Sequence, residues 1–291
     1  MEPEVALEPI APSIDLYACP SCGTALARGH ADQLVCATGR HMYPVVAGVP
    51  DLRDLQVRPH SESVLRDVAL WSAARRGRDP WRRPRARAWA ALLGVGRQIA
   101  PPPGVFADLG AGEGQLAREA AWLGYRALAI DLAAPPARPG VERARGTLEA
   151  LPLSSACVRV MAMSASLHYA RDPVRALQEA RRVLTADGVL LIALTPVNET
   201  VGGAELAAEH TRRAIRTAGG TGPLATGYRH LVATDLSAAF HLAGFSVTER
   251  PWALGRMWET RRRILRALTG RELARFPLVV ARPRESARAS G

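Results

Sequence analysis

The chain has 291 residues, of which 48% are apolar, 22% charged and only 5% aromatic. This apolar fraction excludes a wholly disordered chain, and the length suits one full-sized domain with a small accessory domain. No run approaches the roughly 18 consecutive apolar residues of a membrane span, and the acidic start Met-Glu-Pro-Glu is unlike a signal peptide. We therefore expect a cytoplasmic protein that does not bind a membrane.

The net charge is +11, which by itself favours a nucleic-acid partner. However, all 38 basic residues are arginine and the chain has no lysine. Together with the abundance of Ala, Gly and Pro, this pattern is typical of GC-rich coding, which scatters arginines without regard to function. The basic charge is therefore no sufficient argument for RNA binding.

The first hundred residues divide into three predicted segments. Residues 1–15 are rich in Pro and Glu and are expected to form a flexible tail. Residues 16–55 hold three of the four cysteines in a compact unit, the predicted zinc ribbon. Residues 56–100 carry apolar positions at helical spacing and an arginine-rich run at 75–87, and we expect a helical linker or cap. The proline run at 101–103 marks a domain boundary.

The cysteine cluster has the spacing of a metal site. Cys19 and Cys22 form a Cys-x-x-Cys pair, and Cys36 follows. A tetrahedral zinc ion needs a fourth ligand. His41 is the expected one, and His30 is the competing candidate. A closed Cys₃His set leaves no open coordination position, which indicates a structural zinc rather than a catalytic one.

After the prolines, short apolar runs alternate with helical periods, which predicts an α/β fold with a doubly wound, mostly parallel sheet over residues 101–282. A glycine-rich insert at 198–230, with Tyr228, Arg229 and His230 near its end, interrupts the pattern and is expected to cover the substrate. Residues 283–291 are expected to be a second flexible tail. Strands are predicted at 105–109, 127–130, 158–163, 189–194, 245–247 and 278–281.

A glycine-rich turn lies between the first of these strands and the next helix. Asp108 precedes Gly110, Gly112 and Gly114, whereas a dinucleotide fingerprint would place its third glycine one residue later. A carboxylate beside the turn repels a pyrophosphate but suits a cofactor that carries an ammonium group. Asp131 ends the second strand, where a carboxylate can accept both hydroxyls of a ribose.

The segment 104–195 resembles a class I S-adenosylmethionine-dependent methyltransferase, of the group that methylates quinones and other small molecules. The matching stretches are ADLGAGEGQLARE, ALAIDL, GTLEALPLSSACVRVMAMSASLHYARDP and ALQEARRVLTADGVLLIALTP. The resemblance implies a Rossmann-like sheet of seven strands and an enzyme that uses S-adenosylmethionine.

The resemblance also implies a set of site residues. Thr147 stands where the family usually has Asp, and a hydroxyl is a weaker acceptor for the adenine amine than a carboxylate. Methyl transfer is an in-line displacement that needs alignment first and a base only if the acceptor loses a proton. His168 and Tyr169, just past the predicted strand at 158–163, are the catalytic candidates, with His168 as the base. The expected cofactor-binding residues are Asp108, Gly110, Ala111, Gly112, Asp131, Leu132, Thr147, Leu148 and Ser164.

The cysteine-containing stretch YACPSCGTALARG…LVCATGRHMYPVVAGVPDLR resembles two zinc modules. One is the activator subunit of several tRNA and protein methyltransferases. The other precedes the catalytic domain of 23S ribosomal RNA guanine-N1 methyltransferases. A small-molecule acceptor is the favoured hypothesis, and an RNA methyltransferase of the guanine-N1 type is the alternative. A non-catalytic scaffold that uses the ribbon to bind a partner is the alternative from another class.

Overall fold

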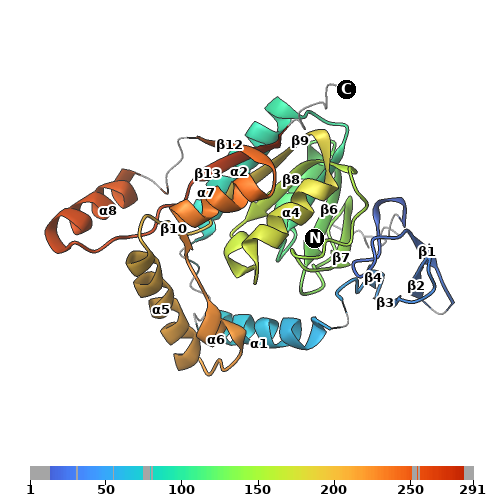
Figure 1. The fold of residues 1–291 in the computed structure, drawn as a ribbon, viewed down its shortest axis with the longest axis horizontal. Coiled ribbons are helices and arrows are strands. Elements are labelled where there is room, and N and C mark those ends of the chain that lie inside the picture. Colours follow the sequence, from blue (N-terminus) through green and yellow to red (C-terminus); the bar gives the residue numbers. More distant parts are fainter. Residues whose placement is uncertain are drawn as a thin grey trace, which may run out of the picture.

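The computed structural model describes residues 14–284 except 31, 55, 75–78, 80, 251–253 and 255. Residues 1–13 and 285–291 of the two predicted tails, and residues 75–78 and 80 of the arginine run at 75–87, lie outside the described residues. Figure 1 shows an α/β body, a small sheet at one side of it and a separate group of helices below it.

The body is built on a seven-stranded sheet in the order β12-β13-β9-β8-β5-β6-β7. Strand β13 is antiparallel to both of its neighbours, and the pairs among β5 to β9 are parallel. The predicted α/β class with a mostly parallel, Rossmann-like sheet is confirmed. The strands are β5 (Val105–Leu109), β6 (Arg126–Asp131), β7 (Val141–Arg145), β8 (Val158–Ser164), β9 (Leu184–Ala193), β12 (Phe245–Arg250) and β13 (Leu278–Pro283).

Helices cover both faces of this sheet because its central strands are apolar on both sides. Helices α2 (Arg82–Ile99) and α3 (Gln115–Trp122) pack in one apolar cluster with the sheet. Helices α4 (Pro173–Val183) and α7 (Ala233–Leu242) pack in the other. Helix α4 starts where the Asp172 carboxylate accepts the amide of Arg175 at 3.0 Å, which caps the first turn.

Three helices form a layer of their own, here called the cap: α1 (Arg58–Ala74), α5 (Val201–Thr217) and α6 (Pro223–Gly227) (Figure 1). They share a small apolar cluster that includes Val64, Ile215 and Tyr228. Two short parallel strands, β10 (Val197–Asn198) and β11 (Leu231–Val232), join the cap to the body.

The N-terminal unit is a four-stranded antiparallel sheet that follows a 3-10 turn, η1 (Ile14–Leu16). Its buried side chains, such as Leu34 and Tyr43, belong to the same apolar cluster as α4 and α7. Two isolated bridges, Tyr17 with Leu153 and Asp51 with Arg145, tie it to the body. The unit is therefore built into the body rather than tethered to it. Its strands are β1 (Leu26–Arg28), β2 (Gln33–Cys36), β3 (Met42–Val46) and β4 (Val49–Pro50).

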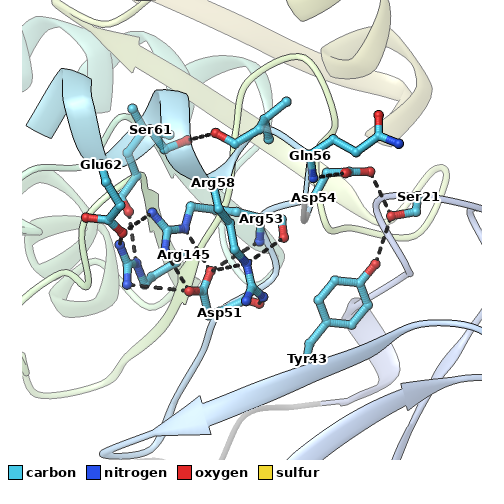
Figure 2. Close-up of polar contacts among 12 residues, drawn as sticks. Ser21, Tyr43, Asp51, Arg53, Asp54, Gln56, Arg58, Ser61, Glu62 and Arg145 are labelled. Carbon is cyan, nitrogen blue, oxygen red and sulfur yellow. Dashed lines mark hydrogen bonds and ion pairs between the residues drawn. The ribbon is translucent and has the colours of Figure 1, made fainter. Parts of the chain in front are cut away.

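An ion-pair network around the buried Arg53 lies where this unit meets the edge strand β7 and the cap helix α1 (Figure 2). The Arg53 guanidinium, whose side chain is only 2% exposed, donates to both oxygens of Asp51 at 2.8 and 2.7 Å and to Glu62 at 2.7 Å. Arg145, the last residue of β7, donates to the same Glu62 at 2.8 Å. The network therefore joins the N-terminal unit, the cap and the main sheet at one point.

Helix α8 (Arg256–Thr269) lies between β12 and β13 in the chain and projects from the body (Figure 1). Its Met257 and Leu268 side chains are exposed. Within the described ranges, the structure has no helix with both the length and the apolar character that a membrane crossing needs.

Candidate functional site

The glycine turn after β5 packs directly against the loop that follows β8. Gly110 has a φ of 72°, and a Cβ added to it would come within 2.3 Å of the Ser166 Cβ. Only glycine combines this left-handed backbone with so close an approach. The turn therefore brings two loops at the carboxyl ends of neighbouring strands, the usual ligand edge of such sheets, into contact.

Asp131, the last residue of β6, is held by backbone amides of this turn and of its own loop. Its Oδ2 accepts the Gly112 amide at 2.9 Å, and its Oδ1 accepts the Ala133 amide at 3.0 Å. Burial raises the pKa of Asp131, although these amide hydrogen bonds oppose the shift. Asp131 and Gly112, both predicted to bind the cofactor, are thus brought together.

Asp108 lies beneath the turn and is 2% exposed. Its Oδ2 accepts the Ala117 amide at 3.3 Å. Burial raises the pKa of Asp108 to about 7, and the nearby Asp131 adds to this shift. A buried carboxyl of this kind is stabilised in its ionised form by a cation, and an ammonium group would serve.

The loops on the predicted adenine side are tied to each other. Arg145 Nε donates to the Leu132 carbonyl at 2.9 Å, and the Gly146 amide donates to the Asp131 carbonyl at 2.9 Å. Leu132 packs against the cap cluster, whereas Leu148 packs against the main core. Thr147 forms a bridge with Ala150 in the same loop.

Aromatic rings gather around the loop that packs on the glycine turn. The rings of His168 and Tyr169, on the 3-10 turn η2 (Leu167–Tyr169), lie 4.3 Å apart. Tyr228 lies 5.6 Å from His168 and 5.7 Å from Tyr169, and it also contacts His230 at 5.9 Å and Trp71 at 6.4 Å. Cap residues and the predicted catalytic residues therefore form one cluster.

His168 is neutral in this setting. Its side chain is buried, and burial, followed by the nearby His230, lowers the pKa of His168 to about 3. Its Nδ1 has no hydrogen-bond partner among the described residues. Ser164, at the end of β8, accepts a hydrogen bond from Trp89 Nε1 at 3.0 Å. Helix α2 therefore reaches this edge of the sheet.

Two residues of this cluster were not predicted from the sequence. Trp71 on α1 and Asn198 on β10 were not proposed as site residues, although Asn198 is fully buried and its Oδ1 lies 3.0 Å from His230 Nδ1. No motif surrounds either residue. Only the packing of the cap onto the body brings them to the site.

The N-terminal unit brings together a second group of side chains. The ligand atoms of Cys19, Cys22, Cys36 and His41 all lie within 4.8 Å of one another, and the group does not include His30. His41 Nδ1 lies 3.4 Å from Cys19 Sγ and 3.5 Å from Cys36 Sγ. Sulfur and nitrogen ligands of one tetrahedral zinc ion lie about 3.6 Å apart, so the geometry fits zinc.

Two thiols of this group have lowered pKa values, which favours the thiolate form that binds a metal. Burial acts against ionisation of Cys36, but hydrogen bonds from the Thr38 hydroxyl and the His41 amide lower its pKa to about 5. The Thr24 hydroxyl lowers the pKa of Cys22 to about 7. Thiolates are the ligands that zinc takes from cysteine.

Comparisons with known proteins agree with this arrangement. Residues 107–192 match the family described as "Methyltransferase domain". The structure is similar to the YcgJ protein from Bacillus subtilis, at 15% identity and a TM-score of 0.53, over 69% of this chain and 100% of that chain. It is also similar to 1,6-didemethyltoxoflavin-N1-methyltransferase from Burkholderia thailandensis, at 18% identity and a TM-score of 0.50, over 89% of this chain and 99% of that chain.

No curated protein matches the sequence. At these identities the two solved structures support the fold, and the family match supports the activity of residues 107–192. The glycine turn and the carboxylates of Asp108 and Asp131 lie within the matched segment. The strands of this segment are neighbours in the seven-stranded sheet. The chain therefore carries a class I S-adenosylmethionine-dependent methyltransferase domain.

Proposed function

We propose that this enzyme transfers the methyl group of S-adenosylmethionine to a small molecule held between the cap and the sheet. The observation that supports this acceptor class is the cap cluster, against which both Leu132 on the cofactor side and Tyr169 on the acceptor side pack. A helical cap that packs on the loops of a site leaves little room for a macromolecule, whereas it suits a small aromatic acceptor.

The cofactor is proposed to lie across the glycine turn. The Asp131 carboxylate would accept the ribose hydroxyls, and Asp108 would pair with the ammonium group of the methionine end. The amides of Ala111 and Gly112 would line the turn, and Leu132 with Leu148 would contact the adenine. Thr147 would accept from the adenine amine, and Ser164 would lie beside the sulfonium.

The aromatic cluster is proposed to align the acceptor. Methyl transfer needs the nucleophile, the methyl carbon and the sulfur in line, so rigid walls supply much of the rate enhancement. His168 and Tyr169 occupy a buried turn that packs on the glycine turn through Ser166, which fixes their position relative to the cofactor. Both imidazoles of the cluster, His168 and His230, are neutral at physiological pH because burial lowers the pKa of each.

The N-terminal unit is proposed to be a zinc ribbon. Cys19, Cys22, Cys36 and His41 would hold the ion as a closed set without an open position. Zinc there would contribute folding free energy and no chemistry at the methyl group. Its place at the edge strand β7 supports a structural role.

The acceptor class is tested with methyl-labelled S-adenosylmethionine. The enzyme and cofactor are incubated with an extract of the native host cells, which is then separated into small-molecule, RNA and protein fractions. We expect the label in the small-molecule fraction. Label in RNA would overturn this acceptor class and support the guanine-N1 type of RNA methyltransferase, and label in protein would overturn it equally.

The placement of the cofactor is tested by Asp131→Ala. Hydrogen bonds to a charged acceptor contribute about 1.5–3 kcal/mol each, so the loss of the ribose contacts is expected to weaken cofactor binding by about 100-fold or more. Titration calorimetry with S-adenosylhomocysteine measures this. Asp187→Ala, which removes a surface carboxylate paired with Arg159, is the matched control and is expected to bind normally.

Two outcomes would contradict the proposal in different ways. If Asp131→Ala binds like the parent protein, the cofactor is placed wrongly. If the parent protein itself binds neither S-adenosylmethionine nor S-adenosylhomocysteine, the chain is a scaffold and not a transferase.

A further inference from the structure

Asn198 and His230 form a partly buried polar contact between β10 and the residue before β11. Asn198 is fully buried on β10, and its Oδ1 lies 3.0 Å from Nδ1 of His230. The two residues are adjacent because β10 pairs with β11, whose first residue Leu231 follows His230 and donates its amide to the Pro196 carbonyl at 3.0 Å. Burial of a side-chain amide costs free energy unless its polar atoms form hydrogen bonds.

Glu272 holds the two residues that follow Asn198 in the chain. The Glu272 carboxylate accepts the amide of Glu199 and, at 2.8 Å, the hydroxyl of Thr200. Burial acts to raise the pKa of Glu272, but these hydrogen bonds and the Asn198 side chain outweigh it and lower that pKa. The Asn198 Nδ2 has no hydrogen-bond partner among the described residues.

The orientation of the Asn198 amide determines where the proton of His230 lies. An amide oxygen only accepts hydrogen bonds, so Nδ1 of His230 must carry the proton and donate it to Asn198 Oδ1. Nε2 of the neutral ring then holds a free lone pair. The contact with Asn198 therefore leaves Nε2 of His230 as the ring nitrogen that can accept a proton.

His230 is also more accessible than His168. His168 is 5% exposed, whereas His230 is only partly buried. His230 contacts Tyr228, which in turn contacts both His168 and Tyr169 on the loop beside the glycine turn. The groups that face His230 are thus Tyr228, Asn198 and the neutral His168, whose pKa the neighbouring His230 helps to lower.

We propose that His230, rather than His168, receives the proton that the acceptor loses on methylation, and that Asn198 and Glu272 are positioning residues that fix its tautomer. This inference rests on the proposed function. It narrows the acceptor to a molecule whose reacting atom is a hydroxyl oxygen or a heteroaromatic ring nitrogen that bears hydrogen.

The step balances without a further reactant. The acceptor lone pair forms a bond to the methyl carbon, and the carbon–sulfur bond breaks with its electron pair left on sulfur, which gives S-adenosylhomocysteine. The acceptor proton passes to His230 Nε2 and then to solvent. Burial lowers the pKa of His230 to about 4. A weak base suffices, because the acceptor atom becomes positively charged, and hence strongly acidic, as the methyl group arrives.

The tautomer is tested without any acceptor, by nitrogen-15 NMR of the histidine rings in the full chain bound to S-adenosylhomocysteine. We expect His230 protonated at Nδ1 and unprotonated at Nε2. Asn198→Leu is expected to abolish this preference, and Glu272→Gln to weaken it. His230→Gln assigns the His230 signals by their loss, and His241→Gln, which removes an exposed ring on α7, is expected to leave them unchanged.

The proton transfer is tested with the acceptor found by methyl labelling. His230→Gln is expected to lower kcat about 100-fold with unchanged S-adenosylhomocysteine affinity, and His168→Gln is expected to have a smaller effect. Asn198→Asp is expected to raise the pKa of His230 and to move the acid limb of the pH–rate profile to higher pH. The added carboxylate still accepts from Nδ1 and stabilises the imidazolium.

Several results would overturn the inference. They are a parent His230 protonated at Nε2, a His230→Gln enzyme with unaltered kcat and pH profile, or an acceptor whose reacting atom bears no hydrogen. Unchanged cofactor affinity in the variants shows that they are folded. Failure of the parent protein to bind the cofactor would refute the proposed function instead.

Discussion

At the scale of single residues, Asp108 shows how burial prepares a group for a charged ligand. The carboxyl is enclosed under the glycine turn, where one backbone amide at 3.3 Å is its described hydrogen-bond donor. Burial therefore raises its pKa to about 7. An ammonium group would replace the missing hydration and favour the ionised form, so binding would release a proton wherever Asp108 is protonated in the free enzyme.

This linkage predicts pH-dependent cofactor binding. Because only ionised Asp108 pairs with the ammonium group, affinity for S-adenosylhomocysteine is expected to be full above pH 7 and to fall by up to about tenfold per pH unit below it. Calorimetry between pH 5.5 and 7.5 measures the effect. Asp108→Asn is the control, with weaker binding that does not change over this range. Constant affinity in the parent protein would show that Asp108 does not meet the ammonium group.

At the scale of elements, the cap depends on one buried carboxylate. Asp67 on α1 is 1% exposed and accepts the amides of Gly222, Leu224 and Ala225 at 2.9–3.1 Å. These amides belong to the first turn of α6, which has no side-chain cap of its own. A negative charge at a helix N-terminus also interacts favourably with the helix dipole. Asp67 thus joins two helices of the cap that are distant in the chain.

Removal of this contact is expected to destabilise the protein. Asp67→Ala leaves buried amides without a partner and is expected to lower the free energy of unfolding by about 3 kcal/mol. Urea denaturation measures it. Asp187→Ala, at an exposed ion pair with Arg159, is expected to change that free energy by less than about 0.5 kcal/mol. Equal effects of the two substitutions would mean that α6 is held by its apolar contacts instead.

At the scale of the whole molecule, the N-terminal unit and the methyltransferase domain share one core. Leu34 and Tyr43 of the unit lie in the same cluster as the sheet and helices α4 and α7. The Arg53 network adds a buried ion pair with Asp51 and a partly exposed one with Glu62 to this junction (Figure 2). A junction with both a common core and satisfied buried charges is expected to unfold as one unit.

Loss of the proposed zinc ion is therefore expected to weaken the entire chain. Cys22→Ser should lose zinc in metal analysis and lower the melting temperature by at least about 5 °C in a single transition. Cys157→Ser, outside the ligand group, is expected to keep both. Retained stoichiometric zinc in Cys22→Ser would refute the ligand set. A methyltransferase domain that melts at its original temperature would refute the coupling.

The sequence predicted those elements that are specified by residues close together in the chain. Strand β5 and the turn from Asp108 to Gly114 were predictable because an apolar run followed by glycines specifies this geometry locally. Strand β7 was not among the predicted strands. Its sequence Val-Glu-Arg-Ala-Arg has no apolar run, and its Glu142 is buried against Arg126 at 2.9 Å.

By itself, then, the sequence determined the α/β class, the methyltransferase domain and the four candidate metal ligands, because each depends on residues within one strand, turn or short spacing. Only the tertiary structure decided what surrounds the acceptor. Asn198 and His230 are 32 positions apart, and Asp67 contacts Gly222 across 155. Such pairs leave no periodic pattern in the chain, since their partners are chosen by how the cap packs on the sheet and by the need to satisfy buried polar groups.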